Sequence, residues 1–279
     1  MRHWFLLCWG LCFLGPNIPA HGQSSNGFVK FGSLQELLDT HQREFLEERM
    51  QTTPQQAPWE KGEFVLIAID GGAGSGKTST ARVIAERNNF AFVSTGEHYR
   101  ILTRYLAEEN ISPGNAAALR GALGRLRPTT QFIGNQAHMC LDGTVVPAEE
   151  LHNGVINTIV ADYAQNPTLR EFLHDYQRQL PQTAQAVGYA GLVIEGRDMT
   201  SAVFPEADLC VFLDADPRTR QLRRKMEGIA DDIHARDTKD SPRLQRRDGM
   251  LYVDSTELSL DEVVSIIQKE IQKLTVEHH

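Results

Sequence analysis

The chain has 279 residues, of which 41% are hydrophobic and 23% are charged, and its formal net charge is -8. This length allows one domain of about 200 residues or more with smaller additional segments, and the acidic balance argues against a general nucleic-acid or membrane-surface binder. Any basic binding region must therefore be local. The four cysteines form neither a CxxC pair nor a spaced His/Cys metal set, and only two of them lie outside the apolar N-terminal segment. That pattern fits a reducing compartment.

The first 20 residues have the layout of a secretory signal, with a basic residue, an apolar run and an end that contains proline and alanine. The run is too short to cross a bilayer as a helix, so we expect no stable membrane insertion. The alternative is a true start downstream, for example at Met50. Residues 21–61 form an extension, in which Ser33 and Glu36 make the capping box of a predicted helix and a linker rich in Gln, Thr and Pro follows.

Residues 64–80, FVLIAIDGGAGSGKTST, contain three signals in sequence. An unbroken apolar run over 65–69 predicts a parallel strand that is buried on both faces. The next residues fit G-x-x-x-x-G-K-[ST], a loop in which main-chain N–H groups and the start of a helix wrap a polyphosphate. A helix is then predicted over 80–88. Strand, glycine loop and helix thus follow one another as a phosphate-binding loop requires.

The glycine loop predicts where ATP and its metal bind. Lys77 is expected to reach the β- and γ-phosphates, and the hydroxyl of Thr78 or Ser79 is expected near Mg²⁺. The predicted ATP-binding residues are Gly71, Gly72, Ala73, Gly74, Ser75, Gly76, Lys77, Thr78 and Ser79.

Downstream of the loop, the apolar pattern alternates between the strand and helix periods. Strands are predicted over 90–93, 131–133, 138–141, 192–194, 209–213 and 251–253, with a turn at Asp142-Gly143. Helices are predicted after residue 96, over 148–164 and 168–179, and after the capping box of Ser259 and Glu262. Together these elements indicate an α/β fold with a doubly wound parallel sheet, whose ligands bind at the carboxyl ends of the strands.

Several motifs besides the glycine loop carry a family resemblance. They are STGEHYR (94–100), EGRDMTSAVFPEADLCVFLDAD (195–216), RDTKDSPR (236–243) and VDST (253–256). In this order they resemble cytidylate kinase, the bacterial CMP/dCMP kinase of the nucleoside-monophosphate kinase family. The resemblance covers about residues 64–274, within a domain expected over 62–279. It implies that residues 129–151 are a small inserted part that binds the monophosphate, and that the basic stretch 218–243 is an arginine-rich lid.

The resemblance also implies roles for individual residues. Thr95 and Arg100 match positions that hold the monophosphate acceptor, and Arg170 and Asp198 match positions near its base. A carboxylate can accept from the amino group of cytosine and a guanidinium can donate to its ring acceptors, whereas uracil offers a carbonyl instead of the amino group. The implied substrate-binding set is Thr95, Arg100, Arg170, Asp198, Asp240 and Arg243. The implied catalytic set is Lys77, Arg197, Arg220, Arg224 and Arg236.

The implied reaction is transfer of the γ-phosphoryl group of ATP to CMP or dCMP, with Mg²⁺ accompanying ATP. A phosphate acceptor needs no strong general base, so the residues must bring two anions together and neutralise their charge. We expect only small nucleotides as partners, a monomer, no nucleic acid, and a cytoplasmic location, with export as the alternative if residues 1–20 act as a signal. Departures from the family pattern at His152, Ala161, Thr200-Ser201 and 244–247 leave two alternatives open. These are a nucleotide-binding regulatory protein with weak or no kinase activity, and a kinase with another small acceptor such as UMP.

Overall fold

The computed structural model describes residues 64–226, 238, 243–244 and 246–276. The signal-like segment, the helix predicted from Ser33, the linker, Arg236 and Asp240 lie outside the described residues. Among the described helices, none has both the length and the apolar character that a membrane span requires.

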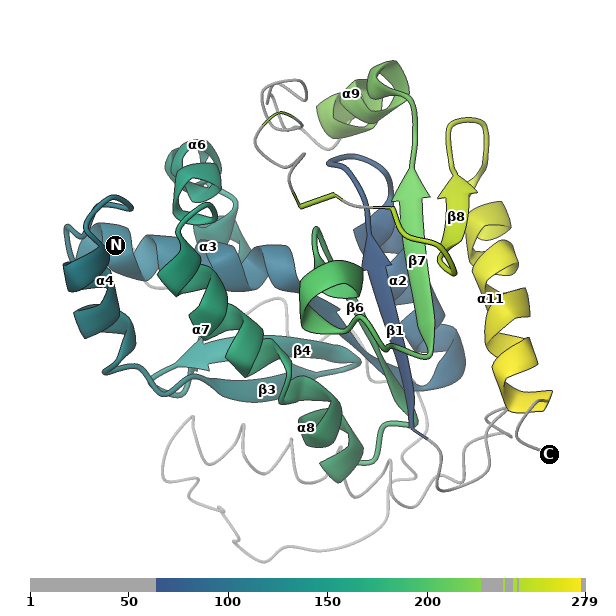
Figure 1. The fold of residues 1–279 in the computed structure, drawn as a ribbon, viewed down its shortest axis with the longest axis horizontal. Helices are drawn as coiled ribbons and strands as arrows, with labels where there is room; N and C mark the ends of the chain where they lie inside the picture. The colour runs from purple at the N-terminus through teal and green to yellow at the C-terminus, as the bar shows by residue number, and fades with distance from the viewer. Residues whose placement is uncertain (1–63, 227–237, 239–242, 245, 277–279) are drawn as a thin grey trace, which may run out of the picture. The chain divides into compact units, whose positions relative to one another are not determined.

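The described strands form an eight-stranded sheet with the order β3-β4-β2-β6-β1-β7-β8, and β5 pairs with β4 (Figure 1). The strands are β1 (Val65–Asp70), β2 (Phe90–Ser94), β3 (Thr129–Ile133), β4 (Gln136–Leu141), β5 (Thr144–Val145), β6 (Gly191–Gly196), β7 (Leu209–Asp214) and β8 (Leu251–Asp254). β2, β6, β1, β7 and β8 run parallel, which confirms the predicted fold class. β3 and β5 each pair antiparallel with β4 at one edge.

Helices cover both faces of this sheet (Figure 1). They are α2 (Lys77–Asn88), α3 (Thr95–Glu108), α4 (Ala116–Leu123), α5 (Ala148–Leu151), α6 (Gly154–Tyr163), α7 (Pro167–Gln177), α8 (Leu180–Ala186), the π-helical turn η1 (Met199–Val203), α9 (Pro217–Met226) and α11 (Leu260–Val276). Ile67 and Ile69 of β1 pack in the core beneath α2 and α11, while Ala68 faces the core formed with α3, α4, α7 and α8. This alternation follows from the two-residue period of a strand, and it explains why β1 reads as a continuous apolar run.

Two predicted features of the chain need correction. The single helix predicted over 148–164 is wrong, because the chain forms α5 and α6 with a break at His152 and Asn153. The Asn153 side chain accepts a hydrogen bond from the Ile156 N–H at 2.9 Å, and an asparagine followed by glycine favours a new helix start over helix continuation. The short helices α4 and α8 were not predicted at all. The α4 helix has a similar cap, in which Asn115 accepts from Ala118 N–H at 3.1 Å.

Two local predictions from turn and cap chemistry are confirmed. Asp142 and Gly143 both have positive φ, 53° and 75°, as a two-residue hairpin turn between β4 and β5 requires. The Ser259 N–H donates to Glu262 Oε2 at 2.8 Å and the Glu262 N–H donates to Ser259 Oγ at 3.3 Å, which is a capping box at the start of α11. The strands predicted over 131–133 and 138–141 lie within β3 and β4, which with β5 extend one edge of the main sheet.

A buried carboxylate connects the end of β1 to η1. Asp70 is 1% exposed and accepts hydrogen bonds from the Met199 N–H, the Thr200 N–H and the Thr200 hydroxyl at 2.8, 2.8 and 2.6 Å. Burial raises the pKa of Asp70, and the three hydrogen bonds only partly offset that effect. The end of β1, where the glycine loop begins, is therefore tied to the turn that follows β6.

We expect Asp70→Ala to lower the free energy of unfolding by roughly 3 kcal/mol, because it leaves three buried donors without an acceptor. Chemical denaturation followed by circular dichroism measures this change. Asp261→Ala is the matched control, since it removes a carboxylate whose ion pair with Arg87 is exposed, and it should leave stability nearly unchanged. Equal losses in the two variants would show that the buried contacts of Asp70 contribute nothing special.

Candidate functional site

The glycine loop lies between β1 and α2 and is shaped by contacts that exclude side chains. A Cβ on Gly71 would lie 2.0 Å from the carbonyl oxygen of Leu213, and Gly74 has a φ of +73° with the Arg220 carbonyl 2.6 Å from a Cβ position. Gly76 precedes α2 without a side-chain cap. The first N–H groups of α2 are thus available to an anion, and the helix dipole favours negative charge there.

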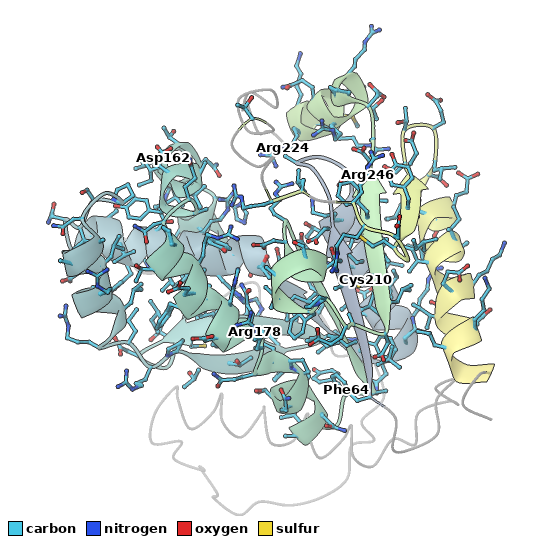
Figure 2. The ribbon with its side chains drawn as sticks, viewed as in Figure 1. Phe64, Asp162, Arg178, Cys210, Arg224 and Arg246 are labelled. Carbon is cyan, nitrogen blue, oxygen red and sulfur yellow. The ribbon has the colours of Figure 1, made fainter. Side chains whose placement is uncertain are left out.

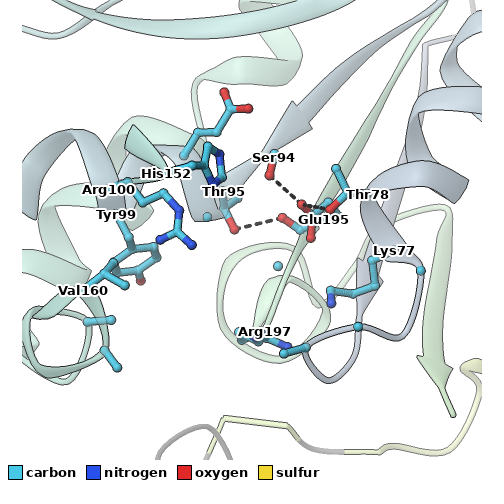
Figure 3. Close-up of a pocket in the computed structure, with 18 of the residues that line it drawn as sticks. Lys77, Thr78, Ser94, Thr95, Tyr99, Arg100, His152, Val160, Glu195 and Arg197 are labelled. Carbon is cyan, nitrogen blue, oxygen red and sulfur yellow. Dashed lines mark hydrogen bonds between the residues drawn. The ribbon is translucent and has the colours of Figure 1, made fainter. Parts of the chain in front are cut away.

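Lys77 and Arg197 each bond to a main-chain carbonyl at the start of this loop. Lys77 is 7% exposed, and its Nζ donates to the Gly72 carbonyl at 2.8 Å. The Arg197 guanidinium, from the residue after β6, donates to the Gly71 carbonyl. Figure 3 shows both side chains beside the loop. The structure therefore brings together two cations that are 120 positions apart in the sequence, at the place where a polyphosphate would be held.

A buried glutamate that the sequence interpretation missed lies beside Thr78. Glu195 is 5% exposed, and its Oε1 accepts from Ser94 Oγ at 2.6 Å and from Thr78 Oγ1 at 3.1 Å. Its main-chain carbonyl accepts from Thr95 Oγ1 at 2.8 Å (Figure 3). A carboxylate at the carboxyl end of a buried strand, directly before Gly-Arg-Asp, was the available sequence signal.

The oxygen atoms around Thr78 suit a hard divalent cation. Mg²⁺ prefers one or two protein oxygens together with phosphate oxygens and water, and the Thr78 hydroxyl and the Glu195 carboxylate supply such a pair. The Ser79 hydroxyl also lines the pocket but makes no hydrogen bond with any described residue. Within 64–226 and 246–276, there is no cluster of three His, Cys, Asp or Glu side chains that could hold a metal alone. The donor set therefore fits a metal carried by a nucleotide.

The glycine loop opens into a pocket of about 410 Å³. Described lining residues include six Lys or Arg and three acids, so the pocket is locally basic in an acidic chain. The cations are Lys77, Arg82, Arg100, Arg197, Arg224 and Arg243, and the acids are Glu97, Glu195 and Asp198. A basic cavity of this size suits polyanionic ligands.

Residues predicted to bind the acceptor line the same pocket. Thr95 and Arg100 belong to α3 and are 2% and 7% exposed, and Figure 3 shows Arg100 beside Tyr99 and His152. Burial, with the charges of Arg100 and Arg224, lowers the pKa of His152, so its imidazole is neutral at neutral pH. Of Arg100 and His152, only Arg100 therefore carries a positive charge at neutral pH.

Asp198, which lines the pocket, forms an ion pair with Arg170. Arg170 of α7 donates to Asp198 Oδ2 at 2.5 Å, and His174 Nε2 lies 3.4 Å from the same oxygen. Burial alone would raise the pKa of Asp198, but the neighbouring His174 and the charge of Arg170 together lower it. Asp198 is therefore an ionised acceptor in the pocket wall. His174 was not predicted, although its spacing of four residues from Arg170 places both on one helical face.

The basic run over 218–225 does not form one patch. Arg224 lines the pocket and lies above the carboxyl ends of the strands (Figure 2). Arg220 is not among the described lining residues; its Nε donates to the Ala215 carbonyl at 2.9 Å and its Nη1 to the Ala73 carbonyl at 3.2 Å. The Arg223 guanidinium donates to the hydroxyl of Ser255 at 2.9 Å and to its main-chain carbonyl at 2.6 Å. Because α9 turns once in 3.6 residues, neighbouring arginines point in different directions. Arg243 reaches the pocket, while Arg236 and Asp240 lie outside the described residues.

Comparison with known proteins gives consistent matches. The family described as cytidylate kinase matches residues 67–273. A cytidylate kinase from Alkaliphilus oremlandii is 34% identical over 220 residues, which cover 74% of this chain and 96% of that protein. Cytidylate kinases from Pseudothermotoga lettingae and Streptomyces avermitilis are 31% and 29% identical, covering 76% and 73% of this chain and 96% and 90% of those proteins.

Proposed function

Because the chain belongs to the cytidylate kinase family, we propose that its pocket transfers the γ-phosphoryl group of ATP to the 5′-phosphate of CMP or dCMP. The products are ADP and CDP or dCDP. The family makes the chain an ATP-dependent phosphotransferase, and we assign this activity to residues 62–279. The observation that carries the proposal is a single pocket that joins the glycine loop to Thr95, Arg100 and Asp198.

On the donor side, the chain's own residues bind and orient the triphosphate. The N–H groups of the loop and of the first turn of α2 hold the phosphates, and Lys77 moves from the Gly72 carbonyl onto the β- and γ-phosphates. Arg197 is released from Gly71 in the same way and neutralises charge on the transferred group. Arg224, with Arg220 and Arg236 of the lid, completes this neutralisation when the lid closes and excludes water.

The metal that accompanies ATP has a place beside Thr78. We propose that Thr78, supported by Glu195, holds Mg²⁺ against the phosphates, with Ser79 as the second hydroxyl nearby. Bound there, Mg²⁺ would neutralise the charge that develops between the β- and γ-phosphates.

On the acceptor side, charge and hydrogen bonding orient the second nucleotide. Arg100 pairs with the 5′-phosphate, and Thr95 donates to the same end. Asp198 accepts from the cytosine amino group while Arg170 donates to the ring acceptors. Asp240 and Arg243 complete the set at the sugar. The acceptor phosphate is already an anion, so positioning and charge neutralisation are sufficient for in-line transfer.

An ADP-release assay with CMP, dCMP, UMP and AMP in parallel tests the function. We expect strong acceptor-dependent ADP formation with CMP and dCMP, and at least about tenfold lower kcat/KM with UMP and AMP. Binding of ATP without acceptor-dependent ADP would favour a regulatory protein, and a preference for UMP would overturn the assignment of the base contacts. We further propose a cytoplasmic location, because the reaction consumes ATP, and a monomeric state, which size-exclusion chromatography tests. N-terminal sequencing of the purified protein tests whether residues 1–20 are retained.

A further inference from the structure

Two side chains of α7 and that of its C-cap residue, Arg178, reach toward the segment 198–202. Arg170, His174 and Arg178 follow one another at intervals of four residues, so they share a helical face. Arg170 donates to Asp198, His174 lies beside Asp198, and Arg178 Nη2 donates to the Ala202 carbonyl at 2.9 Å. The α7 helix therefore contacts both ends of the turn that carries Asp198.

His174, the middle residue of the three, has a polar atom whose burial is not accounted for by a hydrogen bond with any described residue. The His174 side chain is 11% exposed, and its Nε2 is buried without a hydrogen bond within the described residues. A buried polar atom normally has a partner, and Asp198 Oδ2 lies 3.4 Å away, slightly beyond an ideal bond. Catalytic-site hydrogen bonds are often long without ligand and shorten when substrate binds. The Nε2 atom of His174 therefore points toward Asp198 Oδ2 and could donate to it at a shorter distance.

The opposite side of the same turn is held by Asp70. Its carboxylate fixes the N–H groups of Met199 and Thr200, which directly follow Asp198. With the backbone fixed, the remaining freedom of Asp198 is rotation of its own side chain. Arg170 and His174 both engage Oδ2, and no hydrogen bond from a described residue reaches Oδ1. Among the described residues, Oδ1 is therefore the carboxylate oxygen of Asp198 that has no protein donor.

We propose that His174 is a positioning residue for base recognition, which together with Arg170 holds Asp198 so that Oδ1 accepts from the amino group of the acceptor base. This inference rests on the proposed function, in which Asp198 contacts that amino group. Arg170 alone fixes Oδ2 through one bond and leaves rotation about it, whereas a second donor from the next turn of α7 restricts that rotation.

The proposed role of His174 predicts a change in how affinity for the acceptor depends on pH. Asp198 must be ionised to accept from the amino group, and His174 favours the ionised form. Removing the imidazole therefore raises the pKa of Asp198, so affinity for the acceptor is lost at a higher pH as the solution is acidified. The charged and titratable groups that face Asp198 are Arg170 and His174 of α7, Tyr99 of α3, Asp70 of β1 and Arg243.

Two variants of His174 separate its hydrogen bond from its volume. His174→Phe keeps a ring but removes the donor, and His174→Gln places an amide donor near the position of Nε2. Tyr176→Phe is the matched control on the same helix, because it removes a buried hydroxyl that bonds Thr130 at 2.8 Å and does not touch Asp198. KM for CMP, KM for ATP and kcat are measured for each from pH 3 to 8, because the pKa of Asp198 in wild type is lowered from its ordinary value of 3.8. Tm is measured at the same pH values.

We expect His174→Phe to raise KM for CMP about tenfold, with kcat and KM for ATP within about twofold of wild type. The acidic limb of kcat/KM for CMP should move to higher pH, and His174→Gln should recover most of the affinity. A lower Tm with an unmoved acidic limb and unchanged KM would reduce His174 to a structural residue and overturn the proposal. If wild type itself shows no preference for CMP, the proposed function fails first, and the two failures are distinguishable.

Discussion

Replacing Lys77 with alanine should lower kcat for phosphoryl transfer on the order of 10³-fold while the protein stays folded. Lys77 is the first residue of α2 and is 7% exposed, so its ammonium group lies in a low-dielectric position at the loop. No other described lysine lines the pocket. In the proposed mechanism, its loss removes one of the cations that neutralise the transferred phosphoryl group. Folding should suffer little, because the bond to Gly72 contributes only about 1 kcal/mol.

The measurement is ADP release at saturating ATP and CMP, with circular dichroism and thermal unfolding on the same samples. Lys273→Ala is the matched control, since that side chain is 66% exposed and pairs with Glu270 on α11. It should retain wild-type turnover. Wild-type turnover in Lys77→Ala would show that the glycine loop does not take part in catalysis.

Features encoded by neighbouring residues were predictable from the sequence. The glycine loop is one such feature, because the strand, the turn and the uncapped helix start all lie within residues 64–80. The turn at Asp142-Gly143 and the capping box at Ser259 are others. The long helix predicted over 148–164 failed because a single side chain, that of Asn153, competes with the helical main-chain bonds.

Contacts that depend on strand register could not be predicted in the same way. Glu195 pairs with Ile69 of β1 on one side and with Ser94 of β2 on the other, and this register brings it to Thr78. Asp70 meets Thr200 across 130 positions of sequence. The family resemblance named Thr95, Arg100, Asp198 and Arg243, which do line one pocket, but it did not indicate that Arg220 lies against Ala73 and Ala215.

Replacing Asp198 with asparagine should change which base the pocket accepts. Asp198 Oδ2 receives a hydrogen bond from Arg170 at 2.5 Å and lies near His174, and both groups require an acceptor at that position. The carbonyl oxygen of an asparagine should therefore turn toward Arg170, which leaves its NH₂ group at the position of Oδ1. A donor there repels the amino group of cytosine and complements the carbonyl of uracil.

We expect Asp198→Asn to lower kcat/KM for CMP about 10³-fold, because a polar site built for one hydrogen-bonding pattern strongly rejects the opposite one. The kcat/KM for UMP should fall less or rise, so the ratio of UMP to CMP increases about 100-fold. Both values are measured at pH 7.5 with ATP saturating. Asp175→Asn is the control on α7, since that carboxylate is 76% exposed, and it should change neither value. If Asp198→Asn lowers CMP and UMP equally, Asp198 supports the fold of the pocket without reading the base, because loss of a structural anion beside Arg170 would weaken both acceptors alike.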